Sequence, residues 1–229
     1  MSTLLQLVQR LWVESGRLGA GPTTVVNALG DQARAVNRIR DAWRELQQEP
    51  RNWRWMRESV TATLTVDDGQ YTTTDLGIQA DFDSFWPDGM HYAPEVLDAS
   101  DNVLARLDWL PYDEFRHGYM AVQSSGTPMV WSVAPGGDLL LAPAPSEAGM
   151  QIRIDYKHAI QELTLDADTP DMPAKHHLLL VWKALEQFGF ADENAAEKLR
   201  ATMNLKREHA LLLDSQGESP TLDDCEPLA

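Results

Sequence analysis

The sequence predicts an α+β fold, in which the N- and C-terminal segments form an α-helical bundle and an antiparallel β domain is inserted between them. Apolar residues recur at helical spacing early in the chain, at alternate positions in the middle, and at helical spacing again toward the end. The alternating stretches lack intervening helices long enough for parallel crossovers. We therefore expect a bundle from residues 1–58 and 159–213, a β domain at 59–158, and a flexible acidic arm at 214–229.

Two helices are predicted within the first 58 residues. The first has an apolar face made of Leu4, Leu5, Val8, Leu11 and Trp12. The second begins near Asp31, a candidate N-cap, and ends before Pro50. Its apolar stripe consists of Val36, Ile39, Trp43 and Leu46. Trp53 and Trp55 follow beside three arginines, which favours aromatic packing at a helix end, with a cation site or a stacked nucleotide as the alternative.

Alternating apolar residues predict the strands of the β domain. The first strand is indicated by Val60, Ala62, Leu64 and Val66. The sequence Asp67-Asp68-Gly69 predicts a hairpin turn that leads towards Tyr71. The remaining elements are strands at 103–109, 129–133, 139–142 and 150–156, a loop-rich stretch at 81–102, and a short helix at 111–120.

Helical spacing returns in the last third of the chain. One helix is indicated by Leu178, Val181, Trp182, Leu185 and Phe188, and a second by Leu199, Met203, Ala210 and Leu213. From Asp214 onward the chain carries five acids and no base, with only scattered apolar residues. Such a segment cannot bury enough surface to offset its ordering entropy. We expect a disordered arm that folds on a partner.

The charge of the chain argues against direct nucleic-acid binding. The net charge is -16, yet residues 1–58 carry nine bases against six acids, whereas residues 59–158 carry four against fifteen. Phosphate neutralisation by Lys and Arg supplies most of the affinity for DNA. A protein this acidic can lie beside DNA without adhering to it, and its cationic first segment offers a face complementary to the later acidic ones.

Neither a membrane anchor nor a disulfide is expected. The N-terminal stretch carries polar and charged residues at helical intervals, unlike a secretory signal, and no apolar run approaches the length that crosses a bilayer. The single Cys225 cannot form an intrachain disulfide. We expect the product to be cytosolic when made.

Acids and histidines cluster just before the third predicted helix. Asp166, Asp168 and Asp171 precede His176 and His177, residue types that bind metals. Adjacent histidines diverge by about 100° around a helix, however, and a calcium loop would need a Gly and a Glu that are absent here. We predict neither a metal nor a cofactor.

The same stretch is better explained as a structural elbow. Pro173 suits the first helical turn, Asp171 can cap the helix, and Pro170 keeps the incoming chain extended. The residues of this elbow are Asp168, Pro170, Asp171 and Pro173.

No catalytic residue is predicted, but an enzyme and a carbohydrate-binding module stay open as function classes. Paired carboxylates such as Asp113-Glu114 or Asp67-Asp68 suit a wall-degrading glycosidase, which needs two acids across a cleft. Clustered aromatics suit a carbohydrate-binding or tail-fibre module, and the candidate platform is Phe85, Trp86, His91 and Tyr92. Loop residues that cover the core would have the same pattern.

Several motifs, in their order along the chain, resemble the head-to-tail adaptor proteins of tailed phages. Near the N-terminus they are LLQLVQRLWVESG, NRIRDAWRELQQ and NWRWMR. Later they are LPYDEFR, GTPMVWSVAPGGDLLLAPAPSEAGMQIRIDYKHAIQEL and LDADTPDMPAKHHLLLVWKALEQFG. The resemblance covers most of residues 1–213; residues 81–102 and the arm follow no pattern of that family.

The resemblance implies a structural role in the neck of the virion. Such adaptors form a ring, usually of twelve copies, beneath the portal; the ring extends the DNA channel and provides the docking surface for tail or nozzle proteins. DNA then passes through the lumen without specific binding, and no catalytic residue is needed. An arm that becomes ordered on the portal would add affinity, with Leu222, Pro227 and Leu228 as its apolar anchors.

Overall fold

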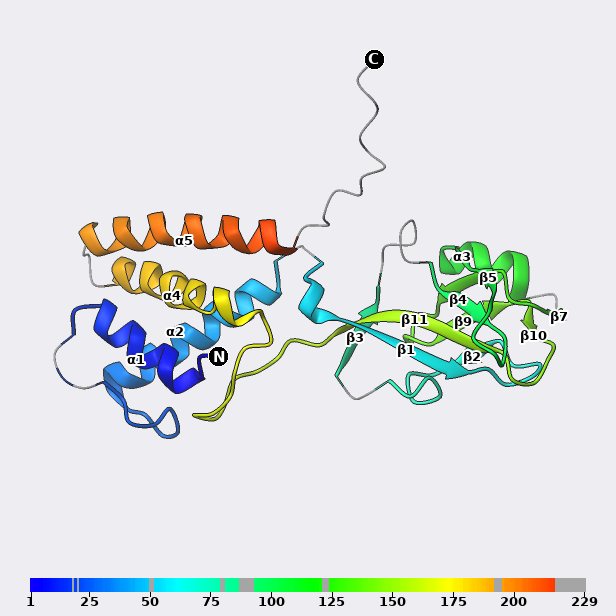
Figure 1. Cartoon of the computed structure of the whole chain (residues 1–229), viewed down its shortest axis with the longest axis horizontal. Coiled ribbons are helices and arrows are strands. Elements are labelled where there is room, and N and C mark those ends of the chain that lie inside the picture. Colours follow the sequence, from blue (N-terminus) through cyan, green and yellow to red (C-terminus); the bar gives the residue numbers. More distant parts are fainter. Residues whose placement is uncertain are drawn as a thin grey trace, which may run out of the picture. The chain divides into compact units, whose positions relative to one another are not determined.

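A computed structural model describes residues 1–17, 19, 21–49, 52–78, 81–86, 93–120, 124–191 and 195–216. Within these residues the chain forms two compact units. One combines Met1–Trp55 with the residues from Gln161 onward, and the other comprises Met56–Ile160. Figure 1 shows that helices from both ends of the chain build the first unit, whereas the second is built mainly of strands. The predicted α+β fold class is confirmed.

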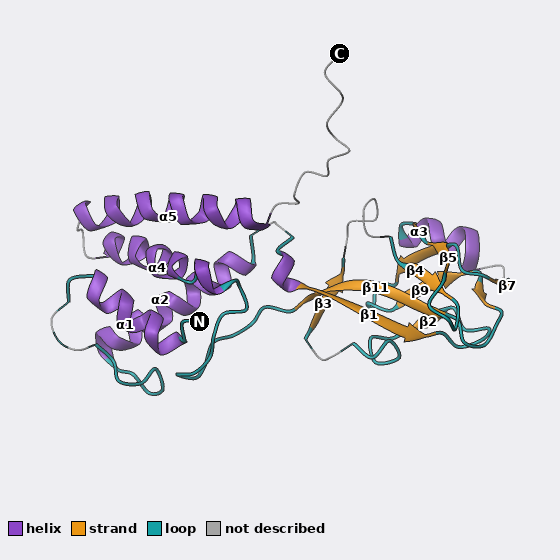
Figure 2. Ribbon diagram, viewed as in Figure 1, coloured by secondary structure: helices purple, strands orange, loops and turns teal. Residues whose placement is uncertain are grey.

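Among its described residues, the helical unit contains four long helices. They are α1 (Leu4–Glu14), α2 (Gly30–Gln47), α4 (Leu178–Ala191) and α5 (Ala195–Gln216), with a 3-10 turn, η3 (Ala174–His176), before α4. Helices α1 and α2 pack against each other and against α4, and α4 also packs against α5 (Figure 2). The N- and C-terminal helices therefore share one core. No helix among the described segments is long and apolar enough to cross a bilayer.

The cores of α1 and α2 follow the predicted stripes with two corrections. Helix α1 buries Leu7 in place of Leu5, which is half-buried. In α2 the predicted residues Val36, Ile39, Trp43 and Leu46 are buried. The predicted N-cap is wrong, because the N-cap is Leu29, two residues before Asp31, and forms no side-chain cap. Asp31 lies in the first turn of α2. There its carboxylate still complements the positive end of the helix.

In α5 three of the four residues of the predicted apolar stripe are exposed, whereas the fourth, Leu213, is half-buried. Leu199 and Met203 are 64% and 66% exposed, and Ala210 is exposed as well. Ala201 and Leu212, on the opposite side, are buried. This correction has a physical reason: small Ala201 permits close packing, so the helix contacts the unit through its less apolar side. The helix continues through Gln216, and so includes the first residues of the predicted arm.

In α4 the buried residues are Leu179, Leu180, Val181, Ala184 and Leu185. Two members of its predicted stripe differ, since Leu178 is exposed and Trp182 is half-buried. The side chain of Phe188 and residue Pro50 lie outside the described parts of the chain.

The β unit contains a five-stranded sheet centred on the long strand β11 (Gln151–His158). On one side β11 pairs with β1 (Arg57–Thr63), and on the other with β3 (Phe82–Phe85) and β4 (Glu95–Leu97). Strand β5 (Val103–Arg106) pairs with β4 at the edge. All these pairs are antiparallel, as predicted. The predicted loop-rich stretch 81–102 is therefore wrong in part, because it contains β3 and β4.

A second sheet has the order β2 (Gln70–Tyr71), β9 (Leu139–Ala142), β8 (Val130–Val133) and β6 (Asp108–Trp109). Two short pairs differ from the antiparallel prediction: β6 with β8, and β7 (Ser125–Gly126) with β10 (Ala144–Pro145), are parallel. The predicted short helix is confirmed as α3 (Tyr112–Phe115) followed by one π turn, Arg116–Met120. Ile152, Ile154 and Tyr156 of the first sheet share a core with Trp131, Leu139 and Leu141 of the second.

The predicted hairpin at Asp67-Asp68-Gly69 is wrong, because the strands on either side belong to different sheets. Strand β1 pairs with β11, whereas β2 pairs with β9. The turn instead carries the chain between the sheets: Asp67 has a φ of 61° and its N–H donates to the carbonyl of Pro145 at 2.8 Å. At Gly69 a Cβ would lie 2.9 Å from the Leu141 carbonyl oxygen, so only glycine fits there.

Candidate functional site

The elbow before α4 is organised around the carboxylate of Asp168. Its Oδ2 accepts hydrogen bonds from the backbone N–H groups of Thr164 at 2.6 Å and Leu165 at 2.7 Å. The bonds from Leu165 and then Thr164 favour the ionised form, and so lower the pKa of Asp168 below its usual range. The carboxylate closes a tight turn, and the hydrogen bonds that it accepts come from the chain itself.

The elbow also binds the start of α1. The N–H groups of Leu4 and Leu5, which have no partner inside the helix, donate to the carbonyls of Asp168 at 2.7 Å and Asp166 at 3.3 Å. The side chain of Asp166 accepts from the Val25 N–H at 2.6 Å. Thr3 completes the helix start through a capping box with Gln6. The backbone carbonyls of Asp166 and Asp168, together with the Asp166 carboxylate, therefore connect the C-terminal segment to the N-terminal one.

The two prolines and Asp171 of the elbow have separate surroundings. Pro170 is buried, and Pro173 occupies the N-cap position of η3, where no side-chain cap is formed. The predicted cap at Asp171 is thus replaced by another contact: Asp171 Oδ1 accepts from Gln161 Nε2 at 3.1 Å, and its N–H donates to Gln161 Oε1. Gln161 thereby fixes the backbone ahead of the helix.

His176 and His177 are buried and point to different partners. His176 Nε2 lies 2.8 Å from Ser215 Oγ on α5. His177 Nδ1 accepts from the Ser2 N–H at 3.1 Å, and its Nε2 lies 3.1 Å from the Met172 carbonyl. Burial lowers the pKa of His176. Among the residues that the structure describes, no group of three or more His, Cys, Asp or Glu is placed to hold a metal ion.

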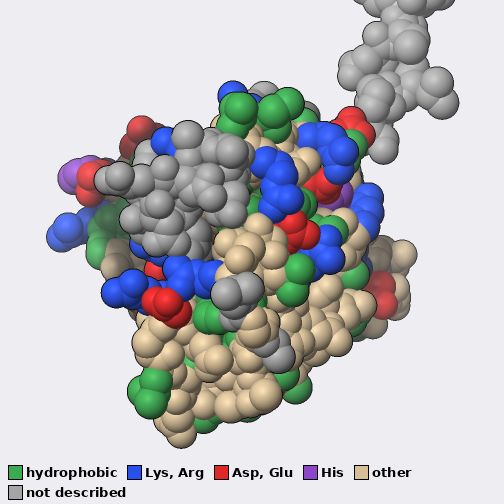
Figure 3. Space-filling view, turned by 90° about the vertical axis from the view of Figure 1, so that its left-hand side faces the viewer, with side chains coloured by type: hydrophobic (Ala, Val, Ile, Leu, Met, Phe, Trp, Pro, Cys, Tyr) green, Lys and Arg blue, Asp and Glu red, His purple; other side chains and the backbone are tan. Residues whose placement is uncertain are grey.

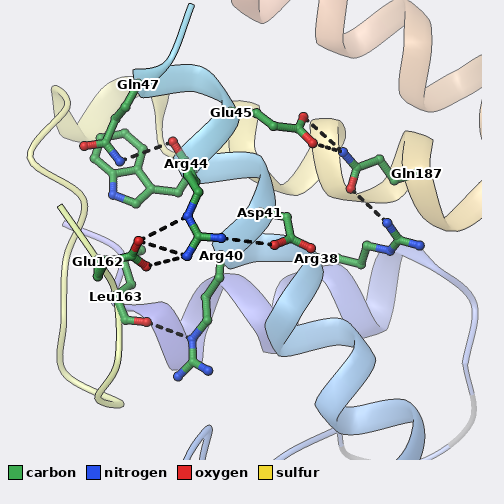
Figure 4. A network of polar contacts seen from close by, with 10 residues as sticks. Arg38, Arg40, Asp41, Arg44, Glu45, Gln47, Glu162, Leu163 and Gln187 are labelled. Atoms are coloured by element: carbon green, nitrogen blue, oxygen red, sulfur yellow. Dashed lines mark hydrogen bonds and ion pairs between the residues drawn. The ribbon is translucent and has the colours of Figure 1, made fainter. Parts of the chain in front are cut away.

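Helix α2 holds the segment that leads into the elbow, as Figure 4 shows. Arg40 donates from Nε to the Leu163 carbonyl at 2.7 Å and from a terminal nitrogen to the Thr164 carbonyl at 2.9 Å. Arg44 forms a bidentate ion pair with Glu162, and Gln47 exchanges two hydrogen bonds with the backbone of Gln161. These long-range partners were not predicted, since no periodic pattern marks a side chain that binds a distant carbonyl.

Comparison of the chain with known protein families shows which family it belongs to. The family model of the SU10 adaptor protein matches residues 2–220, nearly the whole chain. The chain belongs to the SU10 adaptor protein family. A search of curated proteins found no match. The predicted resemblance to phage adaptors is confirmed, and membership makes this chain a phage adaptor protein that interacts with other virion proteins.

The surface of this SU10 adaptor carries charges of both signs. On the face drawn in Figure 3, Lys and Arg side chains lie beside Asp and Glu side chains, with hydrophobic side chains among them. The cationic first segment does not give a purely positive face, because Arg40 and Arg44 are bound within the chain and Arg17 pairs with Asp31.

The carboxylate pairs suggested for hydrolysis lie in ordinary surroundings. Asp113 and Glu114 are exposed in the first turn of α3. Asp67 and Asp68, which are adjacent in sequence, are among the residues that line a pocket of about 640 Å³, and Asp67 Oδ1 accepts from Ser125 Oγ at 2.8 Å. Glycoside hydrolysis needs two carboxyl groups on opposite sides of a substrate, and adjacency in sequence does not by itself supply that arrangement.

The proposed aromatic platform is not assembled as predicted. Phe85 and Trp86 are each 6% exposed, so neither ring is free to stack on a sugar. Phe85 packs edge-on against Trp131, and Arg57 lies over the Trp86 ring. His91 and Tyr92 lie outside the described residues, as do the arm residues Leu222, Pro227 and Leu228. Trp53 and Trp55 stack with centroids 4.6 Å apart, which confirms aromatic packing at the end of α2.

Proposed function

We propose that this SU10 adaptor forms a ring beneath the portal of a DNA-filled capsid, extends the DNA channel, and provides the docking surface for tail or nozzle proteins. The observation that carries the proposal is the family match over residues 2–220. The ring contains twelve copies, in keeping with the resemblance to head-to-tail adaptors. It lies in the neck of the virion, after synthesis in the host cytosol.

The acidic charge of the adaptor supports a conduit for DNA. With a net charge of -16, acids that face the lumen repel the phosphates and limit adhesion as DNA slides past. A passive role is supported by the acids and histidines before α4, which serve contacts within the chain. Asp168, His176 and His177 all have partners that stabilise the helical unit. We accordingly propose that the adaptor is not an enzyme.

The arm provides the contact with the portal. Leu222, Pro227 and Leu228 are its apolar anchors. Because the arm takes its bound conformation only on a portal, the adaptor does not dock before a portal exists.

A truncation tests the role of the arm. Helix α5 extends to Gln216, and Ser215 contacts His176, so the chain should be cut after Gln216 to leave the unit intact. We expect the truncated adaptor to keep its helical circular dichroism but to lose binding to purified portal rings. The triple variant L222A/P227A/L228A should behave likewise, and T221A in the same arm is the matched control. Undiminished binding by the truncated chain would reject the role of the arm.

Release of soluble fragments from peptidoglycan by the purified adaptor would favour the glycosidase instead. The release must then fall when Asp113 and Glu114 are replaced by Asn and Gln. Glycan binding by the isolated chain would favour the carbohydrate-binding module.

A further inference from the structure

Helix α5 presents an apolar stripe to solvent. Figure 1 shows α5 as the outermost helix of its unit, packed on α4. Leu199, Met203 and Ala210 lie along its outer side, with Leu211 next to them, and we call these four residues the outer stripe. Leu211 is 50% exposed, and Leu199 and Met203 are more exposed still. An apolar row of this kind on one helix indicates a surface that another segment covers.

Basic side chains flank the outer stripe. Lys206 and Arg207 lie between Met203 and Ala210 and are exposed. The side chain of Arg207 is 70% exposed and pairs with the neighbouring Glu208 at 2.8 Å. A surface ion pair of this type is weak and leaves the outer side of the guanidinium accessible. The chemistry of this face therefore suits a segment that combines apolar residues with acids.

The chain itself contains such a segment directly after α5. Residues 217–229 carry four acids and no base, together with Leu222, Pro227 and Leu228. Gly217 and Pro220 are residues that favour chain reversal. We propose that residues 217–229 fold back along the outer stripe of their own α5 in the free adaptor.

The lengths of the two segments give the register of this contact. An extended chain advances about 3.3 Å per residue and a helix about 1.5 Å, so each residue of the segment passes about two residues of α5. If the chain reverses at 217–220, Leu222 lies beside Leu211 and Leu228 beside Leu199. Asp223 and Asp224 then lie near Lys206 and Arg207. Apolar residues meet apolar residues, and acids meet bases, in a single register.

Residues 217–229 of the same chain are favoured over those of another copy, because they are covalently attached to the end of α5. It begins one residue after the helix ends, and a short flexible linker gives an effective concentration in the mM range. The contact has a consequence for assembly, and this consequence rests on the proposed function. When a portal takes the arm, the outer stripe becomes uncovered, so a new apolar surface appears only on adaptors that have docked.

The single cysteine of the chain allows a direct test on the free adaptor. A nitroxide spin label is attached to Cys225, and the methionine methyl groups are observed by NMR with carbon-13 labelling. In the proposed register Cys225 lies close to Met203. We expect the Met203 methyl signal to lose most of its intensity and to regain it when the label is reduced. Met129, which is 54% exposed in the β unit, is the matched control and should keep its signal.

Two further samples test whether the basic residues hold the segment and whether the loss of the Met203 signal arises within one chain. The exposed double variant K206E/R207E should restore the Met203 signal, while unchanged signals from the buried Met172 and Met56 verify the fold. The second sample mixes two adaptors: one carries the spin label but no carbon-13, and the other carries carbon-13 but no spin label. In this mixture the Met203 signal should keep its intensity. No loss at Met203 in the labelled chain, or equal loss in the mixture, would overturn the proposal. Portal binding is absent from these measurements, so their failure is distinct from failure of the proposed function.

Discussion

His176 and His177 show how neighbouring residues of one type can serve unrelated contacts. The ring of His176 faces Ser215 on α5, with Lys175, His177 and Glu208 as the charged or titratable groups nearby. His177 connects Ser2 to Met172. Because these partners lie near both ends of the chain, the two histidines connect the N-terminal segment and α5 to the start of α4.

The lowered pKa of His176 makes stability depend on pH. The unfolded chain binds a proton near the ordinary histidine pKa of about 6.5, whereas the folded chain binds it only at lower pH. The stabilisation is therefore complete above about pH 6.5 and is lost as the pH falls below it. We expect the free energy of unfolding, measured with urea, to decrease between about pH 7 and pH 5.

The variant H176Q tests this assignment. We expect it to lose about 1 kcal/mol at pH 7 and to flatten the pH dependence, because glutamine does not titrate. His117 is exposed on the π turn of the β unit, so H117Q is the control and should keep the slope. An unchanged slope in H176Q would show that another group titrates.

At the scale of elements, α2 acts as the anchor of the segment that returns to the helical unit. We expect R40M to lower the free energy of unfolding by about 1 to 2 kcal/mol, because it removes the hydrogen bonds to the Leu163 and Thr164 carbonyls. R34M is the matched control on the same helix. Arg34 is 74% exposed and pairs with Asp31 at 3.5 Å, so its loss should cost less than about 0.5 kcal/mol. Equal urea midpoints for the two variants would contradict the anchoring role.

The sequence predicted those elements whose burial follows one period. Strands β9 and β11 and the stripe of α2 are examples, because each has a continuous buried face. Strands β3 and β4 were missed because they are short and lie among Pro, Gly and Asp residues that favour loops. The apolar spacing in α5 indicated a helix, but periodicity does not say what covers an apolar face, and Leu199, Met203 and Ala210 are exposed.

The candidate site was predictable only in part for a related reason. The elbow stood out through its prolines and aspartates, but its partners did not. Gln161, Arg40 and Gln47 act through backbone carbonyls and amides that are distant in sequence. Such contacts depend on tertiary proximity, which local spacing does not encode. The family, by contrast, was recognisable because the order of many weak motifs extends over most of the chain.

The net charge of the chain disfavours contact with DNA phosphates. It is -16, and Arg40 and Arg44 are engaged by partners within the chain. We expect no retardation of double-stranded DNA by the adaptor at about 0.15 M salt, where nonspecific affinities are already weak. The measurement is an electrophoretic shift over a range of salt concentrations. Binding that weakens steeply with added salt would reveal phosphate contacts and contradict a non-adhesive channel.

The central claim is that the adaptor functions by assembling on a portal rather than by chemistry of its own. Mass photometry of purified portal rings, with and without the adaptor, tests it most directly. We expect the mass of each ring to increase by twelve adaptor chains of 25.7 kDa, and the adaptor alone to form no such ring. An unchanged portal mass at micromolar adaptor concentration, with folded and full-length protein, would contradict the account.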